Sequence, residues 1–234
     1  MKPGDFVEVD YVGKIQKTGK IFDLTLEDVA KEENVYNPKS KYGSVVFIVG
    51  ANFIMKGLDE ALQSMSIGEK KHVIVTPDKA FGERNEEMVR LIPIARFKEQ
   101  NLDPVPGAEI NLGVMKGIIK TVSGGRVKVD FNHPLAGKTL EYDIEIKSKV
   151  DDKERKIKSV VNYFTGLDYQ DIETEIKEPT VDIEIKKQIE MTRPVKGVIS
   201  DTVMKWCDLK KVRFVETFEE KKEQVPKKEP ETKE

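Results

Sequence analysis

The stretch "VGANFIMKGLDEALQSM", residues 49–65, decides how the first part of the chain folds. Four of its apolar residues recur at helical spacing and predict a short amphipathic helix with one buried face. They are Leu58, Ala61, Leu62 and Met65. Ile54 extends the same stripe backward, whereas Phe53 and Met55 lie off it. These last side chains must therefore face something other than the core that the helix builds.

Strand-like segments precede and follow this helix. "DFVEVDYVGKI" alternates apolar and polar residues, and "TGKIFDLT" follows after a glycine turn. "VVFIVG" leads into the helix, and "KHVIVTP" comes after the turn "SMSIGEK". Residues 27–44 are polar and contain Pro38 and Gly43, which predicts a surface excursion with room for one helical turn. The sequence therefore predicts a small α+β domain, mostly antiparallel strand around one helix.

The character of the chain changes after "AFGER". "NEEMVRLIPIARF" is strongly apolar, Pro93 starts a short helix, and "EINLGVMKGIIKTVSGGRVKVDFN" predicts strands around a Ser-Gly-Gly turn. The alternating segment 140–146 then supplies a strand that the first unit lacks. We therefore expect residues 86–131 to be an inserted small, mostly-β domain, and residues 1–85 and 132–150 to form the first domain.

A charge-rich boundary, "KSKVDDKERKIK", precedes a third unit. We expect residues 151–219 to form an α+β domain with a helix over 153–164, two strands around Pro179 and a final strand "KVRFVETF". The tail 220–234 is mostly lysine, glutamate and proline, so it has almost nothing to bury and is expected to be disordered.

A second helix of this third unit carries a large apolar stripe. It begins near Thr192 and Pro194, residue types that suit the N-cap and the first turn. The stripe consists of Val195, Val198, Ile199, Val203 and Trp206. Two hypotheses stay open: this face is the interface of a homodimer, or it packs on the strands of its own domain.

The composition argues against several classes of function. Charged residues make up 35% of the 234 residues, but they nearly cancel to a net charge of −2, so we expect no nucleic-acid partner. Cys207 is the single cysteine, and His72 and His133 are far apart, so neither a disulfide framework nor a metal site is expected. The sequence shows no signal peptide and no apolar run of transmembrane length, which predicts a cytoplasmic protein without membrane contact.

The order and spacing of several segments resemble the FKBP-type peptidyl-prolyl cis-trans isomerases. These segments are "VEVDYVG", "GKIFD", "FIVGANFIMKGLDEALQSMSIGEKKHVIVTPDKAFGER" and "LEYDIEI". The insertion after "AFGER" and the return at "NHPLAGKTLEYDIEI" resemble the SlyD branch, whose flap carries a whole extra domain. Residues 151–234 resemble the C-terminal extension of longer archaeal-type relatives. The resemblance implies an FKBP-like antiparallel sheet wrapped on one short helix.

The resemblance also implies a prolyl pocket built from several segments. Carried over position by position, its catalytic residues are Tyr11, Asp23, Phe47, Ile54, Met55, Leu58, Phe81 and Tyr142. Leu135 and Phe22 add substrate contacts, although for Phe22 a place in the core and a place in the pocket both stay open. Relatives often have tryptophan where Leu58 stands, so this pocket floor is less aromatic. Phe53 is expected to be an exposed aromatic near the rim. The tail lacks the His- and Cys-rich composition of nickel-binding SlyD tails, so no metal function carries over.

The implied reaction breaks no covalent bond and needs no cofactor. Rotation about an X–Pro bond is slow because the amide loses resonance, a barrier of about 18–20 kcal/mol. A catalyst must bind the twisted amide better than the planar one, and an apolar, water-poor cavity favours the less polarised twisted carbonyl. By family analogy the backbone N–H of Met55 holds a substrate carbonyl, while Asp23 and the Tyr11 hydroxyl orient the substrate.

The predicted insert contains more large apolar residues than so small a unit is expected to bury. Flexible, methionine-bearing apolar surfaces suit promiscuous binding. One hypothesis is that the insert captures unfolded, proline-containing polypeptides through Met88, Leu91, Ile94, Phe97, Met115 and Ile119. The other is that half of these residues form its core. For the whole chain we expect a peptidyl-prolyl cis-trans isomerase that assists folding; the alternative is a non-catalytic chaperone or assembly module with the same fold.

Overall fold

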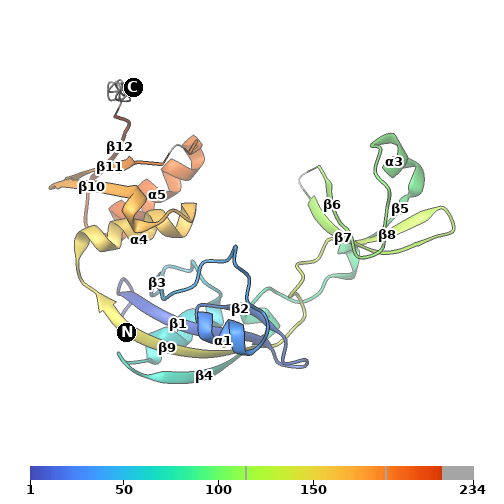
Figure 1. The fold of residues 1–234 in the computed structure, drawn as a ribbon, viewed down its shortest axis with the longest axis horizontal. Coiled ribbons are helices and arrows are strands. Elements are labelled where there is room, and N and C mark those ends of the chain that lie inside the picture. The colour runs from blue at the N-terminus through green and yellow to red at the C-terminus, as the bar shows by residue number, and fades with distance from the viewer. Residues whose placement is uncertain (114, 188, 218–234) are drawn as a thin grey trace, which may run out of the picture. The chain divides into compact units, whose positions relative to one another are not determined.

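The computed structural model describes residues 1–113, 115–187 and 189–217. The chain divides into two compact units, the first comprising residues 1–150 and the second beginning at Asp151 (Figure 1). The tail 220–234, predicted to be disordered, lies outside the described residues. Within the described ranges, no helix is long and apolar enough to cross a membrane. The units combine mostly antiparallel sheets with few helices, so the predicted α+β class is confirmed.

The first unit contains a five-stranded antiparallel sheet. Its strands are β1 (Phe6–Ile15), β2 (Ile21–Leu24), β3 (Val45–Ile48), β4 (Lys70–Val75) and β9 (Leu140–Val150). The order is β2-β1-β9-β4, and β3 also pairs with β1. The long pair β1–β9 extends from Phe6 opposite Val150 to Ile15 opposite Leu140. Strand β9 therefore returns from late in the sequence to the centre of the sheet.

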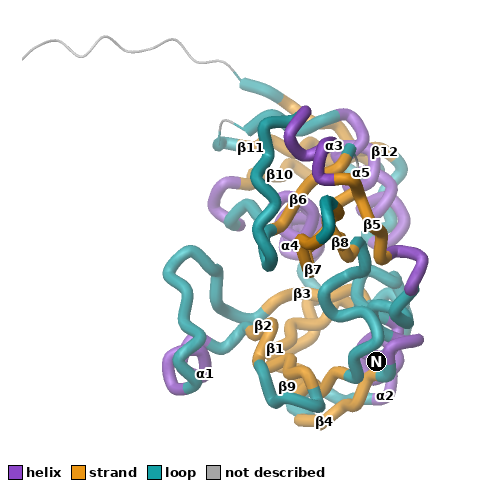
Figure 2. The backbone as a smooth tube through the Cα atoms, turned by 90° about the vertical axis from the view of Figure 1, so that its right-hand side faces the viewer, coloured by secondary structure: helices purple, strands orange, loops and turns teal. Residues whose placement is uncertain are grey.

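The polar segment between β2 and β3 leaves the sheet as a long loop (Figure 2). It contains one short helix, α1 (Glu27–Glu32), of which only Ala30 is buried. The loop returns to the sheet through a hydrogen bond from the Gly43 N–H to the Thr25 carbonyl, 2.8 Å long. The structure therefore has the surface excursion and the helical turn that the sequence predicts.

Helix α2 (Lys56–Ser64) completes the core of this sheet. Leu58, Leu62 and Met65 belong to one buried cluster with residues of the strands. These are Val7, Val9, Ile15, Val75, Leu140, Tyr142, Ile144 and Ile146. The helix approaches β4 so closely that a Cβ atom on Gly57 would lie 2.5 Å from Cγ1 of Val75. Only glycine fits at this contact.

The loop before α2 corrects one expectation from the sequence. The helix begins at Lys56, so Ile54 lies in the loop and does not extend the helical stripe. Gly50 and Asn52 take positive φ angles of 75° and 58°, which turn the chain sharply. The buried carboxylate of Asp59 accepts a hydrogen bond from the Gly50 N–H at 2.8 Å and holds this turn to the helix.

The chain between β4 and β9 forms a second, four-stranded antiparallel sheet, hereafter the insert sheet. In spatial order its strands are β5 (Val89–Pro93), β8 (Arg126–Asp130), β7 (Met115–Ser123) and β6 (Glu109–Leu112), and α3 (Ile94–Glu99) follows β5. Its buried core consists of Phe97, Ile110, Ile119, Val127, Val129 and Phe131. A Cβ atom on Gly117 would lie 2.7 Å from both Phe131 and Val129, so this glycine lets the two side chains pack over β7.

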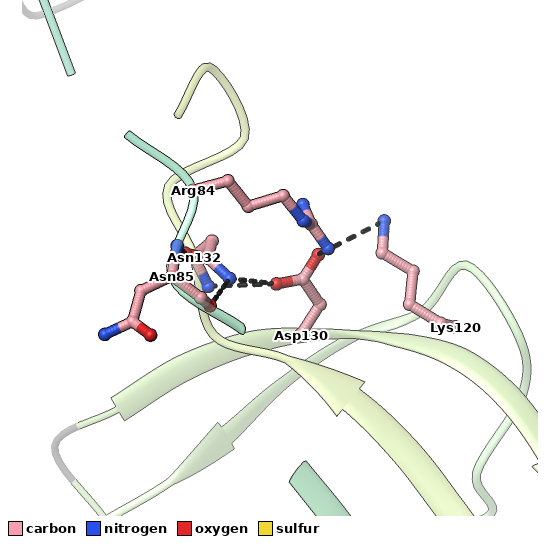
Figure 3. A network of polar contacts seen from close by, with 5 residues as sticks. All are labelled: Arg84, Asn85, Lys120, Asp130 and Asn132. Carbon is pink, nitrogen blue, oxygen red and sulfur yellow. Dashed lines mark hydrogen bonds and ion pairs between the residues drawn. The ribbon is translucent and has the colours of Figure 1, made fainter. Parts of the chain in front are cut away.

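A polar network ties together the two chain segments that lead into and out of the insert sheet (Figure 3). Arg84 Nη2 donates to Asp130 Oδ2 at 2.6 Å, and Asn132 Nδ2 donates to Asp130 Oδ1 at 2.8 Å. The Asn132 side chain also bonds the backbone of Asn85 twice. Its Oδ1 accepts from the Asn85 N–H at 2.8 Å, and its Nδ2 donates to the Asn85 carbonyl at 2.9 Å. Lys120 Nζ lies 3.8 Å from Asp130 Oδ2.

The Asp130 side chain is only 5% exposed, so its charge depends on these partners. Burial pushes the pKa of Asp130 upward, but the hydrogen bonds from Asn132 and Arg84 outweigh it and hold that pKa below its ordinary value. The carboxylate is therefore ionised at neutral pH, and it holds together the two chain segments that lead into and out of the insert sheet.

The second unit contains a three-stranded sheet and two helices. Strand β10 (Ile172–Lys177) pairs antiparallel with β11 (Thr180–Ile185), and β11 pairs in parallel with β12 (Lys211–Val215). Helix α4 (Lys153–Thr165) contacts both β10 and α5 (Arg193–Trp206). Single 3₁₀ turns span 77–79 and 86–88 in the first unit and 169–171 in the second.

The apolar stripe of α5 is buried only in part. Ile199 and Val203 are fully buried, which supports the hypothesis that the helix packs on its own unit. Val198 lies outside this contact and is 46% exposed, whereas Val195 and Trp206 are half-buried. The stripe therefore divides into an inner and an outer part.

Candidate functional site

A group of large, half-buried side chains packs against the core of the first sheet. The buried members of the core that it meets include Leu58 and Tyr142, which are 6% and 2% exposed. Met1, Val73 and Ala80 also pack against this core, and the half-buried side chains that the resemblance predicts for the pocket are Tyr11, Phe22, Phe47, Ile54, Met55 and Leu135. They come from β1, β2, β3, the loop before α2 and the segment before β9. The structure thus brings together all the predicted pocket residues except Asp23 and Phe81 in one packed cluster, hereafter the aromatic cluster.

The rings of this cluster contact one another in favourable geometries. Tyr11 stacks on Phe47 with ring centroids 6.2 Å apart, and it lies tilted against Tyr142 at 5.9 Å. Phe22 meets Tyr142 edge-to-face at 5.7 Å. Aromatic pairs at such distances stabilise each other beyond their buried area. These contacts stabilise the arrangement of the rings, and Phe22 is a half-buried member of the cluster that packs against the core.

Gly13 on β1 makes room for these rings, and sequence reasoning missed it. A Cβ atom at this position would lie 2.8 Å from Cε1 of Tyr142 and 3.0 Å from Cζ of Phe22. A glycine inside an alternating strand is a signal of close approach, so the sequence did contain the clue.

Polar groups border the cluster at Tyr11. Its hydroxyl donates to Asp23 Oδ2 at 2.8 Å, and the Asp23 side chain is exposed. Burial, followed by the negative charge of Asp23, raises the pKa of Tyr142 above its ordinary value. The Tyr142 phenol therefore stays protonated at neutral pH.

Sequence reasoning also missed a partly buried network behind Tyr11. The Tyr11 N–H donates to Thr25 Oγ1 at 2.9 Å. The hydroxyls of Thr25 and Ser44 donate to Asp10 Oδ1 at 3.2 and 2.7 Å. Asp10 is 9% exposed. No pattern in the sequence indicates this network, because its members lie in three separate segments and fit no motif.

The backbone of Met55 provides a hydrogen-bond donor beside the cluster. Its carbonyl accepts from the N–H groups of Leu58 and Asp59 at 3.0 and 3.1 Å. Its own N–H finds no acceptor within the described part of the chain, as is usual at the start of a helix. Phe53, expected to be exposed, is in fact half-buried.

Phe81 lies outside the packed cluster and meets it through His133. Phe81 is 36% exposed, and its ring stacks on the His133 imidazole with centroids 4.1 Å apart and planes 7° from parallel. The other histidine, His72, pairs with exposed Asp143 at 2.8 Å. In the ranges that the structure describes, no three His, Cys, Asp or Glu residues gather as a metal site would require.

Two family models match this chain, "FKBP26, IF domain" over residues 90–135 and "FKBP26_C-terminal" over residues 153–219. The short-type peptidyl-prolyl cis-trans isomerase of Methanocaldococcus jannaschii is 37% identical over 147 residues, which cover 63% of this chain and 92% of that protein. This chain belongs to the FKBP-type peptidyl-prolyl cis-trans isomerases. A probable FKBP-type 16 kDa member from Pseudomonas fluorescens is 33% identical over 58% of this chain and 95% of its own length. SlyD of Aeromonas hydrophila is 35% identical over 56% and 64%.

The predicted binding residues of the insert sheet of this FKBP-type chain separate into two groups. Phe97 and Ile119 are each 1% exposed and belong to the core, so the prediction that they form a binding surface was wrong. So small a sheet needs its largest side chains to exclude water from its own interior. Leu91 is 61% exposed, and the others, Met88, Ile94 and Met115, are half-buried around that core.

A groove of about 560 Å³ crosses the insert sheet beside Leu91 and Met115. Its lining also includes Arg90, Ile92, Arg96, Leu112 and Phe131. The Arg90 guanidinium lies 5.8 Å from the centre of the Phe131 ring. The groove therefore combines aliphatic side chains with two cationic ones.

Proposed function

We propose that the aromatic cluster binds the proline of an X–Pro segment and accelerates rotation about the bond before it. The observation that carries this proposal is the packing of half-buried rings and aliphatic side chains around Leu58 and Tyr142, beside the Tyr11–Asp23 pair. A proline ring is apolar and rigid, and such a half-buried cluster can cover it and exclude water. The residues with catalytic roles are those that the family resemblance predicts.

Each part of the cluster has a distinct task in this mechanism. The apolar side chains favour the twisted amide because its carbonyl is less polarised than that of the planar amide. The Met55 N–H donates to a substrate carbonyl next to the proline. The Tyr11 hydroxyl and the Asp23 carboxylate orient the substrate backbone at the rim. No proton is transferred, because rotation about the X–Pro bond breaks no covalent bond.

The rate of cis-trans isomerisation of a short X–Pro peptide tests this activity. The wild-type chain should accelerate isomerisation of an X–Pro peptide above the uncatalysed rate, and Asp23→Ala and Tyr142→Ala should each slow it. Because Tyr142 is buried, its variant needs a parallel measurement of thermal unfolding. Absence of acceleration by folded wild-type protein would favour the alternative, a non-catalytic chaperone or assembly module.

We propose further that residues 86–131 act as a domain that captures unfolded, proline-containing polypeptides, while residues 1–85 and 132–150 form the isomerase domain. The groove beside Leu91 supports this division because it leaves a large aliphatic side chain in water. Deleting residues 86–131 should preserve turnover of a short peptide and impair refolding of a protein substrate. Equal losses in both assays would refute the division.

A point variant tests the groove in the intact chain. Leu91→Ser should weaken refolding of a protein substrate without changing short-peptide turnover. Leu102→Ser is the matched control, since Leu102 is 40% exposed but does not line the groove. If both serine variants behave alike, exposed apolar area rather than the groove is responsible.

For the second unit, proposed to be a domain over 151–219, we propose a homodimer interface that includes the outer part of α5. Exposed Val198 supports this proposal. Light scattering should give twice the monomer mass for the full chain and the monomer mass for residues 1–150 and for Val198→Asp. A monomeric full chain would refute it. We expect the protein to act on cytoplasmic polypeptides.

A further inference from the structure

His133 contacts two predicted pocket residues that come from different parts of the chain. Its imidazole stacks on the ring of Phe81, with centroids 4.1 Å apart. Its Nδ1 accepts a hydrogen bond from the Leu135 N–H at 3.2 Å, and the Leu135 side chain packs against the buried core of the first sheet. One imidazole therefore links the exposed ring to the aromatic cluster.

The hydrogen bond to Leu135 determines how the imidazole is protonated while the bond exists. A ring nitrogen accepts only through its lone pair, so Nδ1 is unprotonated and the proton is on Nε2. A side-chain acceptor that bonds the N–H two residues ahead imitates the turns formed by asparagine. His133 thus performs two separable tasks, one with its ring face and one with Nδ1.

We propose that His133 is a positioning residue of the prolyl site, which holds the Phe81 ring in place and fixes the turn that presents Leu135. The inference rests on the proposed isomerase function. Phe81 is 36% exposed, and without the stack its ring would be free to change rotamer. A wall that is already in position when substrate arrives costs less entropy on binding.

The backbone around His133 has other support, so substitutions can test positioning without unfolding the segment. The Ala136 N–H donates to the His133 carbonyl at 2.9 Å, and the Lys138 N–H to the Leu135 carbonyl at 3.2 Å. The Gly137 N–H also donates to the Gly82 carbonyl at 2.9 Å, which joins this turn to the segment that carries Phe81. None of these three bonds uses the His133 side chain.

Three substitutions separate the two tasks. His133→Asn keeps an acceptor for the Leu135 N–H but removes the ring. His133→Phe keeps a ring for the stack but removes the acceptor. Because one aromatic contact or one neutral hydrogen bond is lost, we expect each to lower kcat/KM for a short X–Pro peptide about three- to fivefold. His133→Ala removes both and should lower it about tenfold. Thermal unfolding should change little in all three.

A double-mutant cycle distinguishes positioning from a general structural role. If His133 acts by holding Phe81, His133→Asn should have almost no further effect on kcat/KM in a Phe81→Ala background. His72→Ala is the matched control: it removes the chain's other histidine, whose partner is exposed Asp143, and should leave kcat/KM unchanged.

The outcomes separate this inference from the proposed function. No activity in the folded wild type would overturn the proposed function and this inference with it. An active wild type whose three His133 variants stay within twofold of it would overturn the inference alone. So would full additivity of Phe81→Ala and His133→Asn, because then the two rings act independently.

Discussion

The two antiparallel sheets of the first unit differ in the side chains that they leave half-buried. Around the core of the first sheet these include the rings of Tyr11, Phe22 and Phe47 besides aliphatic and methionine side chains, with a hydroxyl–carboxylate pair at the edge. Around the insert core they are aliphatic and methionine side chains: Met88, Ile92, Ile94, Ala108, Leu112, Met115 and Val122. Stacked rings hold one shape, whereas methionine and aliphatic side chains adapt to many partners. Under the proposed function, the first sheet would therefore bind one substrate geometry and the insert sheet many.

The two sheets nevertheless share one packing feature. Each has a glycine on a strand under an aromatic ring, Gly13 beneath Tyr142 and Gly117 beneath Phe131. The same substitution can therefore be made in both cores, and any difference in its functional result reports on the sheets themselves.

The largest expected effects come from truncating one buried side chain in each core. Leu58→Ala should lower the free energy of unfolding by about 2–5 kcal/mol and Phe97→Ala by about 3–5 kcal/mol, because each leaves a cavity. Urea unfolding measures both. Only Leu58→Ala should also slow short-peptide isomerisation in conditions where the protein stays folded. Equal slowing by Phe97→Ala would contradict the separation of the two sheets.

Filling the space over the two glycines should have the next largest effect. Gly13→Ala and Gly117→Ala should each cost about 1–3 kcal/mol, because the new methyl group overlaps aromatic and aliphatic side chains. Gly13→Ala should reduce peptide isomerisation, and Gly117→Ala should reduce only refolding of a protein substrate. Gly197→Ala in α5 is the control, since its Cβ would meet nothing within 4 Å and should be neutral or stabilising.

Removing the carboxylate at the junction should have a smaller, pH-dependent effect. Asp130→Ala should cost about 1–3 kcal/mol at neutral pH because it leaves Asn132 and Arg84 without their acceptor. Since the folded-state pKa of Asp130 is lowered, its contribution is complete above the unfolded value of about 3.9 and is lost as the pH falls through the folded value. Wild type and variant should therefore converge in stability under acid conditions.

Thermal unfolding between neutral pH and strong acid measures this convergence. Asp103→Ala, which changes an exposed carboxylate of the same chain segment, should stay parallel to wild type throughout. A constant gap between wild type and Asp130→Ala at every pH would mean that the charge of Asp130 does not matter.

The smallest effect is expected at the edge of the aromatic cluster. Tyr11→Phe keeps the stack on Phe47 and removes the hydroxyl that donates to Asp23. Because this bond is exposed to water, we expect a loss of about 0.5–1 kcal/mol, which is two- to fivefold in kcat/KM. Tyr42→Phe removes a hydroxyl outside the cluster and should have no effect on the rate. A loss of a hundredfold or more for Tyr11→Phe would mean that this hydroxyl takes part in chemistry.

Local patterns in the sequence predicted most of the secondary structure. Period-two alternation located β1 and β9, and helical spacing located α2, because each pattern records which side of an element faces a core. Turn residues predicted the boundary between β7 and β8 at Gly124 and Gly125. The residues of the proposed site, by contrast, were found through family resemblance and not through any pattern of this kind.

Burial within each pattern was harder to predict. Phe97 and Met115 look alike as apolar residues of the insert, but one is buried and the other half-exposed to the groove. Likewise Ile199 and Val198 are neighbours in sequence, and only the first is buried. A small sheet buries few side chains, and which ones it buries depends on the neighbours that the fold supplies.

The sequence by itself determined most of the elements and their order. Only the tertiary structure decided that Ile54 and Met55, in the loop before α2, pack beside the cluster. It also decided that Gly13 lies under Tyr142 and that His133 stacks on Phe81. The physical reason is that periodicity is a local property of the chain, whereas each of these contacts joins segments that only folding brings together.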